Sequence, residues 1–253
     1  MKIFFLIIPL LTSSVFAQSV ASEEYLRQTE SKGYDLFIHD FLAANATNIV
    51  SVERLQNSDA RGWIVVADGD NWKVRFVGDC DESVCSSFDV AFNLEEQSSR
   101  LTEFEVPEII PDEQLAQWKA RQLALESDVQ RCSETYNTVV LEGLDGAEPV
   151  WEVYLLAATR DPNIVVLGGH HRITISADGS RIIKSEPLTK SCLQAARSTD
   201  AAALMVTNVI GQAPLETHVF SSLLYRMPLY VLTDAGTYEV EGREIRFVEE
   251  NPE

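Results

Sequence analysis

The sequence predicts an α+β fold in which helices pack on antiparallel meander sheets, arranged as two similar helix-plus-sheet lobes. The first observation is that a segment with helical periodicity opens each half of the chain, and short strand-like segments follow it in series. The second is that Asp-Gly pairs stand near the expected turns, at residues 68–69, 145–146 and 178–179. A parallel doubly wound sheet requires helices and strands in regular alternation, and this order is absent from the sequence.

The amino-terminal residues 1–17 have the pattern of a secretory signal peptide. Lys2 precedes a short apolar run, and small residues lead to an expected cleavage after Ala17. The run is too short for a membrane span, and the mature chain begins with Gln18, so no lipid-modified cysteine is expected. We therefore expect a periplasmic or secreted protein with no integral membrane segment after signal cleavage.

The first lobe is expected to cover residues 18–108. Residues 23–48 predict a helix with a buried apolar stripe, on whose polar side His39 falls; the stripe is Tyr34, Phe37, Ile38, Phe41 and Leu42. Residues 62–78 predict a hairpin, and residues 86–94 a third strand.

The second lobe is expected to cover residues 109–253, after a boundary between Pro107 and Pro111. A helix is predicted over residues 112–130, because Pro111 suits the first turn and acidic residues follow it. Antiparallel strands are predicted from there onwards, at residues 136–142, 150–158, 163–176, 181–188, 203–210, 216–225, 228–234 and 237–248.

Two family resemblances accompany these patterns. The segment "VWEVYLLAA…HHRITISADGSRIIKSEP", with the helix before it, resembles PepSY-type exported domains over residues 112–187. This resemblance implies inhibition of a peptidase. The segments "WEVYLLAAT", "GGHHRITIS", "SCL" and "ETHVFSSLLYRMPLYVLT" look like an uncharacterised family of exported bacterial proteins, which implies an envelope setting and no particular activity.

Four cysteines, Cys80, Cys85, Cys132 and Cys192, predict two disulfides in an exported chain, and three connectivities are open. Proximity favours Cys80–Cys85, which leaves Cys132–Cys192. On the chain-entropy account the short loop contributes about 2 kcal/mol and the long loop about 4 kcal/mol. The spacing disfavours a thiol oxidoreductase and a zinc site.

The chain is strongly acidic, with 39 Asp and Glu residues against 20 Lys and Arg and a net charge of −19. Such a charge repels phosphate backbones and anionic lipids, so no nucleic-acid partner is expected. Apolar residues form 45% of the chain, which is enough for a sizeable core.

The segment "VVLGGHHRITIS" carries two of the four histidines. In a strand, His171 would face the core with Ile173 and Ile175, and His170 would lie on the polar face. The two rings can share a metal only if the preceding Gly168-Gly169 pair bulges the strand.

A third imidazole, His218, is expected in a strand that could pair with that of His170, with Glu216 nearby. His170 and His218 are therefore the catalytic candidates, and His170, His171 and His218 the metal candidates. The plainer interpretation is that all three are hydrogen-bonded core residues.

The sequence contains no G-x-S-x-G, S-x-x-K or H-E-x-x-H motif and no phosphate-binding loop of the G-x-x-x-x-G-K type. This absence favours a non-enzymatic module of the envelope that binds an unidentified protein partner and needs no cofactor. Two alternatives stay open. One is a hydrolase or metal-dependent enzyme with a histidine-lined site, and the other is a peptidase inhibitor.

Overall fold

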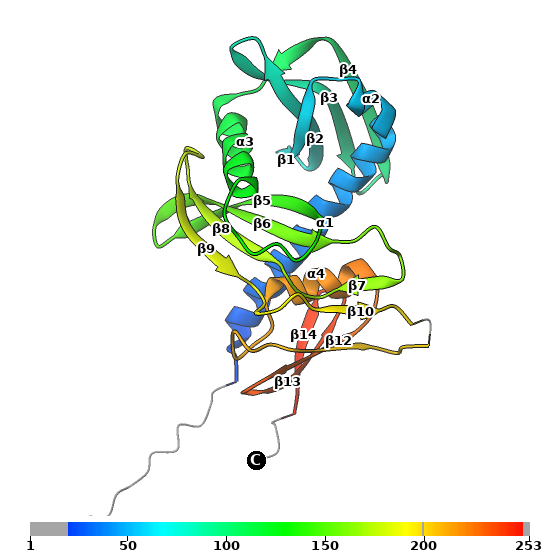
Figure 1. Ribbon diagram of the computed structural model, residues 1–253, viewed down its shortest axis with the longest axis vertical. Helices are drawn as coiled ribbons and strands as arrows, with labels where there is room; N and C mark the ends of the chain where they lie inside the picture. The colour runs from blue at the N-terminus through cyan, green and yellow to red at the C-terminus, as the bar shows by residue number, and fades with distance from the viewer. Residues whose placement is uncertain (1–19, 199, 250–253) are drawn as a thin grey trace, which may run out of the picture.

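The computed structural model describes residues 20–198 and 200–249 (Figure 1). The predicted signal peptide therefore lies outside the described residues. The helices are α1 (Glu23–Val50), α2 (Val52–Gln56), α3 (Asp112–Leu125) and α4 (Glu216–Tyr225). The strands are β1 (Ala60–Asp68), β2 (Asn71–Cys80), β3 (Ser83–Asn93), β4 (Ser98–Ile109), β5 (Thr135–Asp145), β6 (Glu148–Ala158), β7 (Ile164–Val166), β8 (His171–Ser176), β9 (Ile182–Pro187), β10 (Gln194–Ala196), β11 (Leu204–Thr207), β12 (Leu229–Thr233), β13 (Gly236–Glu241) and β14 (Glu244–Glu249).

The first sheet consists of β1 to β4 in chain order, all antiparallel. Its first hairpin turns at the predicted Asp68-Gly69 pair, where Asp68 pairs with Asn71. Ser22 caps the amino terminus of helix α1, and its side chain accepts a hydrogen bond from the Tyr25 N–H. The carboxyl-terminal half of α1 packs on one face of this sheet; the buried cluster includes Leu42, Ala46, Val50, Val74, Phe76, Phe88 and Val90.

The second sheet has the order β5-β6-β8-β9 and is also an antiparallel meander. Helix α3 covers one face of it through Ala120 and Ala124, which pack on Val153 and Ile173. The predicted α+β fold with meander sheets is therefore confirmed, because both halves of the chain contain a helix followed by four antiparallel strands.

The third sheet has the order β11-β12-β13-β14, and α4 packs on it. Two predictions were wrong here. Residues 216–225, expected as a strand, form helix α4, in which Val219 and Leu223 face the third sheet and Phe220 the second. In addition, β11 and β12 are parallel, because α4 connects them and returns the chain to the same end of the sheet.

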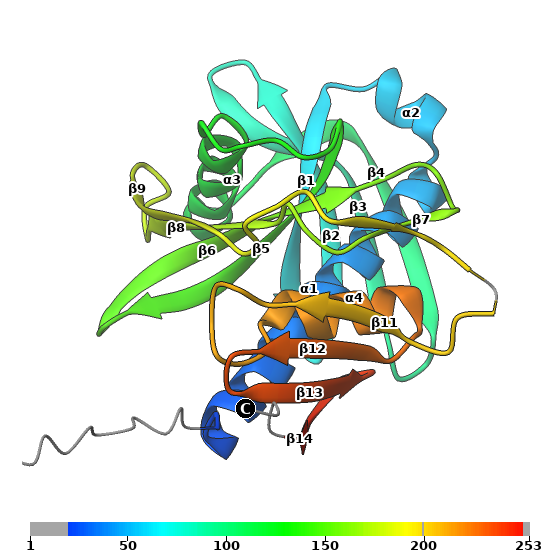
Figure 2. The ribbon, with the colours of Figure 1, turned by 60° about the horizontal axis from the view of Figure 1, so that its bottom comes forward.

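The sheets and helices form successive layers (Figures 1 and 2). Helix α3 lies between the first and second sheets, where Trp118 packs on Ile64 and Val77. Helices α1 and α4 lie between the second and third sheets, where Leu36 and Phe220 pack in a cluster with residues of β5 and β6. The predicted boundary near residue 108 is therefore crossed by buried apolar contacts on both sides of the second sheet.

Both predicted disulfides are formed, Cys80–Cys85 and Cys132–Cys192. The first closes the β2–β3 hairpin, and the second joins the segment after α3 to the segment before β10. Among the described helices, none combines the length and the apolar character needed to cross a membrane.

Candidate functional site

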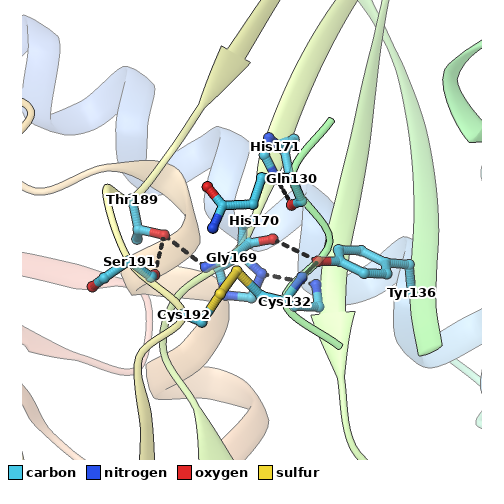
Figure 3. Close-up of a disulfide and its surroundings, with 10 residues drawn as sticks. Gln130, Cys132, Tyr136, Gly169, His170, His171, Thr189, Ser191 and Cys192 are labelled. Carbon is cyan, nitrogen blue, oxygen red and sulfur yellow. Dashed lines mark hydrogen bonds between the residues drawn. A yellow bond between two sulfur atoms is a disulfide. The ribbon is translucent and has the colours of Figure 1, made fainter. Parts of the chain in front are cut away.

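Gly169 allows the chain to run close against the Cys132–Cys192 disulfide (Figure 3). Gly169 has a φ of 82°, and a Cβ at this position would overlap the Cβ of Cys132. A Cβ on Gly168 would collide with the carbonyl oxygen of Ser191. The Gly169 N–H donates a hydrogen bond of 2.6 Å to Thr189 Oγ1. The two glycines therefore serve local packing around the disulfide.

His170 and His218 lie near each other, but through helix α4 and not through a neighbouring strand. The expectation that His170 lies on a polar face was wrong, because it precedes β8 and is 1% exposed, with its ring against Phe220. Glu216, expected near the imidazoles, forms no hydrogen bond with either ring in the described chain. Its Oε1 instead accepts hydrogen bonds from the side chains of Arg172 and Tyr154.

Both rings use their Nδ1 lone pair to accept a backbone hydrogen bond. His170 Nδ1 accepts from the Ala157 N–H at 3.0 Å, and His218 Nδ1 accepts from the Leu215 N–H at 2.9 Å. A neutral imidazole with an accepting Nδ1 carries its proton on Nε2, so each ring is a donor there. Neither ring therefore has a lone pair left for a metal ion or a substrate proton. These Nδ1 hydrogen bonds give both histidines structural roles, and His170 Nε2 is buried without a hydrogen-bond partner in the described chain.

Burial also makes these two imidazoles poor bases. Burial, together with the neighbouring His218 and His171, lowers the pKa of His170 to about 3. Burial lowers the pKa of His218 to about 4. A general base works best with a pKa near the operating pH, so these values disfavour acid–base catalysis at neutral pH.

His171 faces the core with Ile173 and Ile175, as strand alternation predicted. Its Nε2 is hydrogen-bonded to the carbonyl oxygen of Gln130 at 2.9 Å, so Nε2 is the donor (Figure 3). Burial lowers the pKa of His171 as well. Within residues 20–198 and 200–249, no three His, Cys, Asp or Glu side chains are grouped so that they could hold a metal ion.

A cleft of about 460 Å³ lies elsewhere, between the first and second sheets, and α1 and α3 also contribute to its walls. Figure 1 shows these two sheets one above the other, with α3 on one side and α1 on the other. Apolar residues of β1 and β5 line it together with Trp72 of β2 and Trp151 of β6. Its volume falls within the range of ordinary small-ligand sites.

The most unusual group in this cleft is His39 of α1. The sequence predicted His39 on a polar helix face, but the residue is only 8% exposed because Trp72 of β2 lies against it, with the ring centroids 4.9 Å apart and edge to face. Its imidazole forms no hydrogen bond with any residue that the structure describes. Burial lowers the pKa of His39 to about 4, so the ring is neutral at pH 7. It therefore offers one donor and one acceptor to a ligand.

The rim of the cleft is acidic. Asp35, Glu113 and Glu142 are exposed side chains on the rim, and none forms an ion pair within the described part of the chain. Burial raises the pKa of Asp35, although the positive charges of Arg243 and Lys32 act against it. Lys32 is the one basic residue among the described residues of the lining, and its ion-pair partner does not line the cleft.

Lys32 forms an ion pair with Glu152 of β6. Lys32 Nζ lies 2.6 Å from Glu152 Oε2, and the Glu152 side chain is 12% exposed. Because this pair neutralises the lysine, the unpaired charge at the mouth of the cleft is negative.

Two unpaired sheet edges also border the cleft. Strand β1 is the first strand of its sheet and β5 the first of the other, so each has one edge without a neighbouring strand in the described chain. Residues 65–67 and 140–142 line the cleft in succession. Successive side chains of a strand point to opposite faces, so three in a row can border one cavity only along the strand edge. The Val65 carbonyl on this edge accepts a hydrogen bond from Gln117 Nε2 at 3.0 Å.

Sequence reasoning did not find this cleft, because its parts come from separate segments. His39, Trp72 and Glu142 belong to no spacing motif, and only the packing of the two sheets brings them together. The available signal was indirect. His39 directly follows Ile38 of the predicted apolar stripe, so it stands at the border of the buried face of the helix.

No protein-family model matches this chain, no curated protein matches it, and no solved structure matches it. The residues of the cleft and their surroundings must therefore supply the argument for a function.

Proposed function

We propose that this chain is an exported, non-enzymatic binding protein that holds a segment of a partner protein in the cleft between its first and second sheets. The signal-peptide pattern and the two disulfides support a place in the periplasm or outside the cell. The fold supplies the rigid walls of the site, because α3 is packed between both sheets.

The observation that carries this proposal is the imidazole of His39. It is more than nine-tenths buried, it borders an open cleft, and no described residue hydrogen-bonds to it. Its ring nitrogens are not among the fully enclosed, unpartnered polar atoms of the described chain, so they can be reached from the cleft. A ligand in the cleft can therefore hydrogen-bond to His39 in place of water.

The lining of the cleft favours binding over catalysis. No serine, threonine, cysteine or tyrosine is among its described residues, so nucleophilic catalysis through a hydroxyl or a thiol lacks its nucleophile. The low pKa of His39 makes its ring a weak base at neutral pH. Apolar walls with a few polar groups are typical of binding sites.

Selection of phage-displayed random heptapeptides on the immobilised mature protein tests this function. We expect selected peptides to bind the wild type and to lose about tenfold or more in affinity with Ala67→Phe, which fills the cleft from an exposed lining position. Ala202→Phe is the matched control, because it adds the same ring at an exposed alanine outside the cleft.

Selected peptides that bind Ala67→Phe and the wild type equally would place binding elsewhere and contradict the proposal. Failure to select any peptide contradicts it too. Turnover of a substrate in a hydrolase panel, lost with His39→Gln, would establish the enzymatic alternative instead.

A further inference from the structure

We infer that the cleft recognises an extended peptide in which basic and apolar side chains alternate, so that the ligand is a basic, amphipathic segment of a partner. This inference rests on the proposed function and specifies the chemistry of its ligand. Three independent features of the cleft support it: the charge of its rim, the nature of its floor and the two free strand edges.

Charge complementarity determines the basic character of the ligand. Three exposed carboxylates, Asp35, Glu113 and Glu142, stand on the rim without ion-pair partners in the described chain. The one basic residue of the lining, Lys32, is neutralised by Glu152, and His39 adds no positive charge at pH 7. A cationic side chain at the mouth is therefore attracted, and an anionic one is repelled.

The floor determines the apolar part of the ligand. Val65, Val140 and Leu141 are buried residues of the lining, and the indoles of Trp72 and Trp151 lie beside them. A simple polyamine presents charge without enough apolar surface to cover this floor. A ligand with leucine-like groups covers the part of this apolar lining that is still exposed, on the half-buried Val66 and Trp72.

The strand edges determine the extended conformation. The edges of β1 and β5 face the cleft, and no strand pairs with them in the described chain, which is the arrangement used when a peptide adds to a sheet. In an extended peptide, alternate side chains point in opposite directions. One set then reaches the apolar floor while the other set reaches the acidic rim. The neutral imidazole of His39 is placed to hydrogen-bond a peptide group of the ligand.

Titration calorimetry of the mature protein with synthetic hexapeptides tests this inference. The probes are KLKLKL, the neutral QLQLQL, the acidic ELELEL, the block sequence KKKLLL, and free spermidine as a cation without apolar groups. We expect KLKLKL to bind about tenfold more tightly than QLQLQL and KKKLLL, and ELELEL and spermidine to give no saturable binding. Affinity for KLKLKL should fall as salt rises from about 50 mM to about 500 mM.

Two sets of variants assign the effect to the rim. Replacing the rim acids together, with Asp35→Asn, Glu113→Gln and Glu142→Gln, should weaken KLKLKL about tenfold and leave QLQLQL within about twofold. The control replaces exposed acids outside the cleft with the same change in net charge, through Asp81→Asn, Glu95→Gln and Glu96→Gln, and should leave both peptides unaffected.

His39→Phe keeps an aromatic ring of similar size and removes the hydrogen-bonding atoms. It should lower the affinities for KLKLKL and QLQLQL by the same factor, because the imidazole is expected to hydrogen-bond the peptide backbone, which is the same in both peptides.

The possible failures are distinguishable. If KLKLKL and QLQLQL bind equally well and both lose affinity with Ala67→Phe, the cleft is a binding site but its preference for basic ligands is disproved. If spermidine binds as tightly as KLKLKL, the ligand is a small amine and the peptide is disproved. If KLKLKL binds Ala67→Phe as well as the wild type, it binds the acidic surface elsewhere, and the proposed function fails together with this inference.

Discussion

At the scale of single residues, the segment "GGHH" shows how a pattern suggestive of chemistry can serve packing. Gly169 adopts a backbone conformation that side chains rarely tolerate and touches the Cys132–Cys192 disulfide. His170 uses its Nδ1 to accept a hydrogen bond from a main-chain N–H of β6. A histidine that binds a metal through Nε2 carries its proton on Nδ1 and could not accept this hydrogen bond. His170 Nε2 is itself buried without a partner in the described chain, whereas the isolated His39, which belongs to no motif, has its imidazole on the cleft.

Gly169→Ala tests the packing role of the glycine pair. The added Cβ both strains a φ of 82° and overlaps Cys132, so we expect the free energy of unfolding to fall by about 3 kcal/mol or more. Gly146→Ala is the control, because its φ is 66° and nothing lies within 4 Å of a Cβ there. The free energy of unfolding of the control should fall by only about 1 kcal/mol, which is the cost of backbone strain alone. Urea denaturation measures both, and equal losses would disprove the overlap.

At the scale of elements, the strands were predictable where the turn chemistry was local. The β1–β2, β5–β6 and β8–β9 connections contain the Asp-Gly pairs at 68–69, 145–146 and 178–179, because glycine there takes the positive φ that a tight turn requires. Pattern and turn agree in these hairpins, and the α+β class follows from them.

Helix α4 was misread because the usual signals of helix ends are missing. Leu215 occupies the N-cap in place of Ser, Thr, Asp or Asn, and the side chain of His218 reaches back to its N–H. Arg226 takes the left-handed conformation at the carboxyl end, where glycine is usual. The short apolar run between these ends fits a strand as well as a helix, so only tertiary packing between the second and third sheets decides the outcome.

The disulfides are a second test at this scale, because they tie elements of different sequence separation. Cys80 and Cys85 are 5 residues apart, whereas Cys132 and Cys192 are 60 apart. We expect the double variant Cys132→Ala/Cys192→Ala to lose about 4 kcal/mol of unfolding free energy. The matched variant Cys80→Ala/Cys85→Ala should lose about 2 kcal/mol. Urea midpoints and slopes at pH 8 measure both losses, and the reverse order would show that loop length does not set them.

At the scale of the whole molecule, the cleft could not be predicted from the sequence. His39, residues 65–67 and residues 140–142 meet because the edges of two separate sheets face each other across α1 and α3. A hairpin can be predicted from its turn residues and from the alternation of apolar residues in its strands. The packing of one sheet beside another produces no pattern of this kind in the sequence. The composition shows that the chain is acidic, but it does not show that Asp35, Glu113 and Glu142 meet at the rim of one cleft.

Buried titratable groups connect the whole fold to pH. Burial lowers the pKa of His39 and of His218 to about 4 and that of His170 to about 3, all from an unfolded value near 6.5. A depressed imidazole pKa stabilises the fold fully above pH 6.5, and this contribution is lost as pH falls towards the folded value. Asp40 has the opposite sign, since burial raises its pKa to about 6, against a hydrogen bond from Asn137 that lowers it. It therefore destabilises the fold increasingly as pH rises from about 4 to about 6.

The sum of these effects predicts a marked loss of stability in mild acid. When the pH falls from 8 to 5, protonation of each of these three imidazoles in the unfolded state should lower the free energy of unfolding by about 2 kcal/mol. Protonation of Asp40 in the folded state should raise the free energy of unfolding by about 1 kcal/mol over the same range. His170→Asn keeps an acceptor for the Ala157 N–H and cannot titrate, so its loss over this pH range should be smaller than that of the wild type by about 2 kcal/mol.

Asp40→Asn is the control with the opposite sign. It should be more stable than the wild type at pH 8 by about 3 kcal/mol, because it removes a buried charge and keeps an oxygen that accepts from Asn137. Its loss on acidification should be steeper than that of the wild type, because the compensating group is gone. Urea denaturation at pH 8, 6.5 and 5 measures all three proteins. A wild type equally stable at pH 8 and pH 5, or identical slopes for the two variants, would show that these groups do not control the acid response.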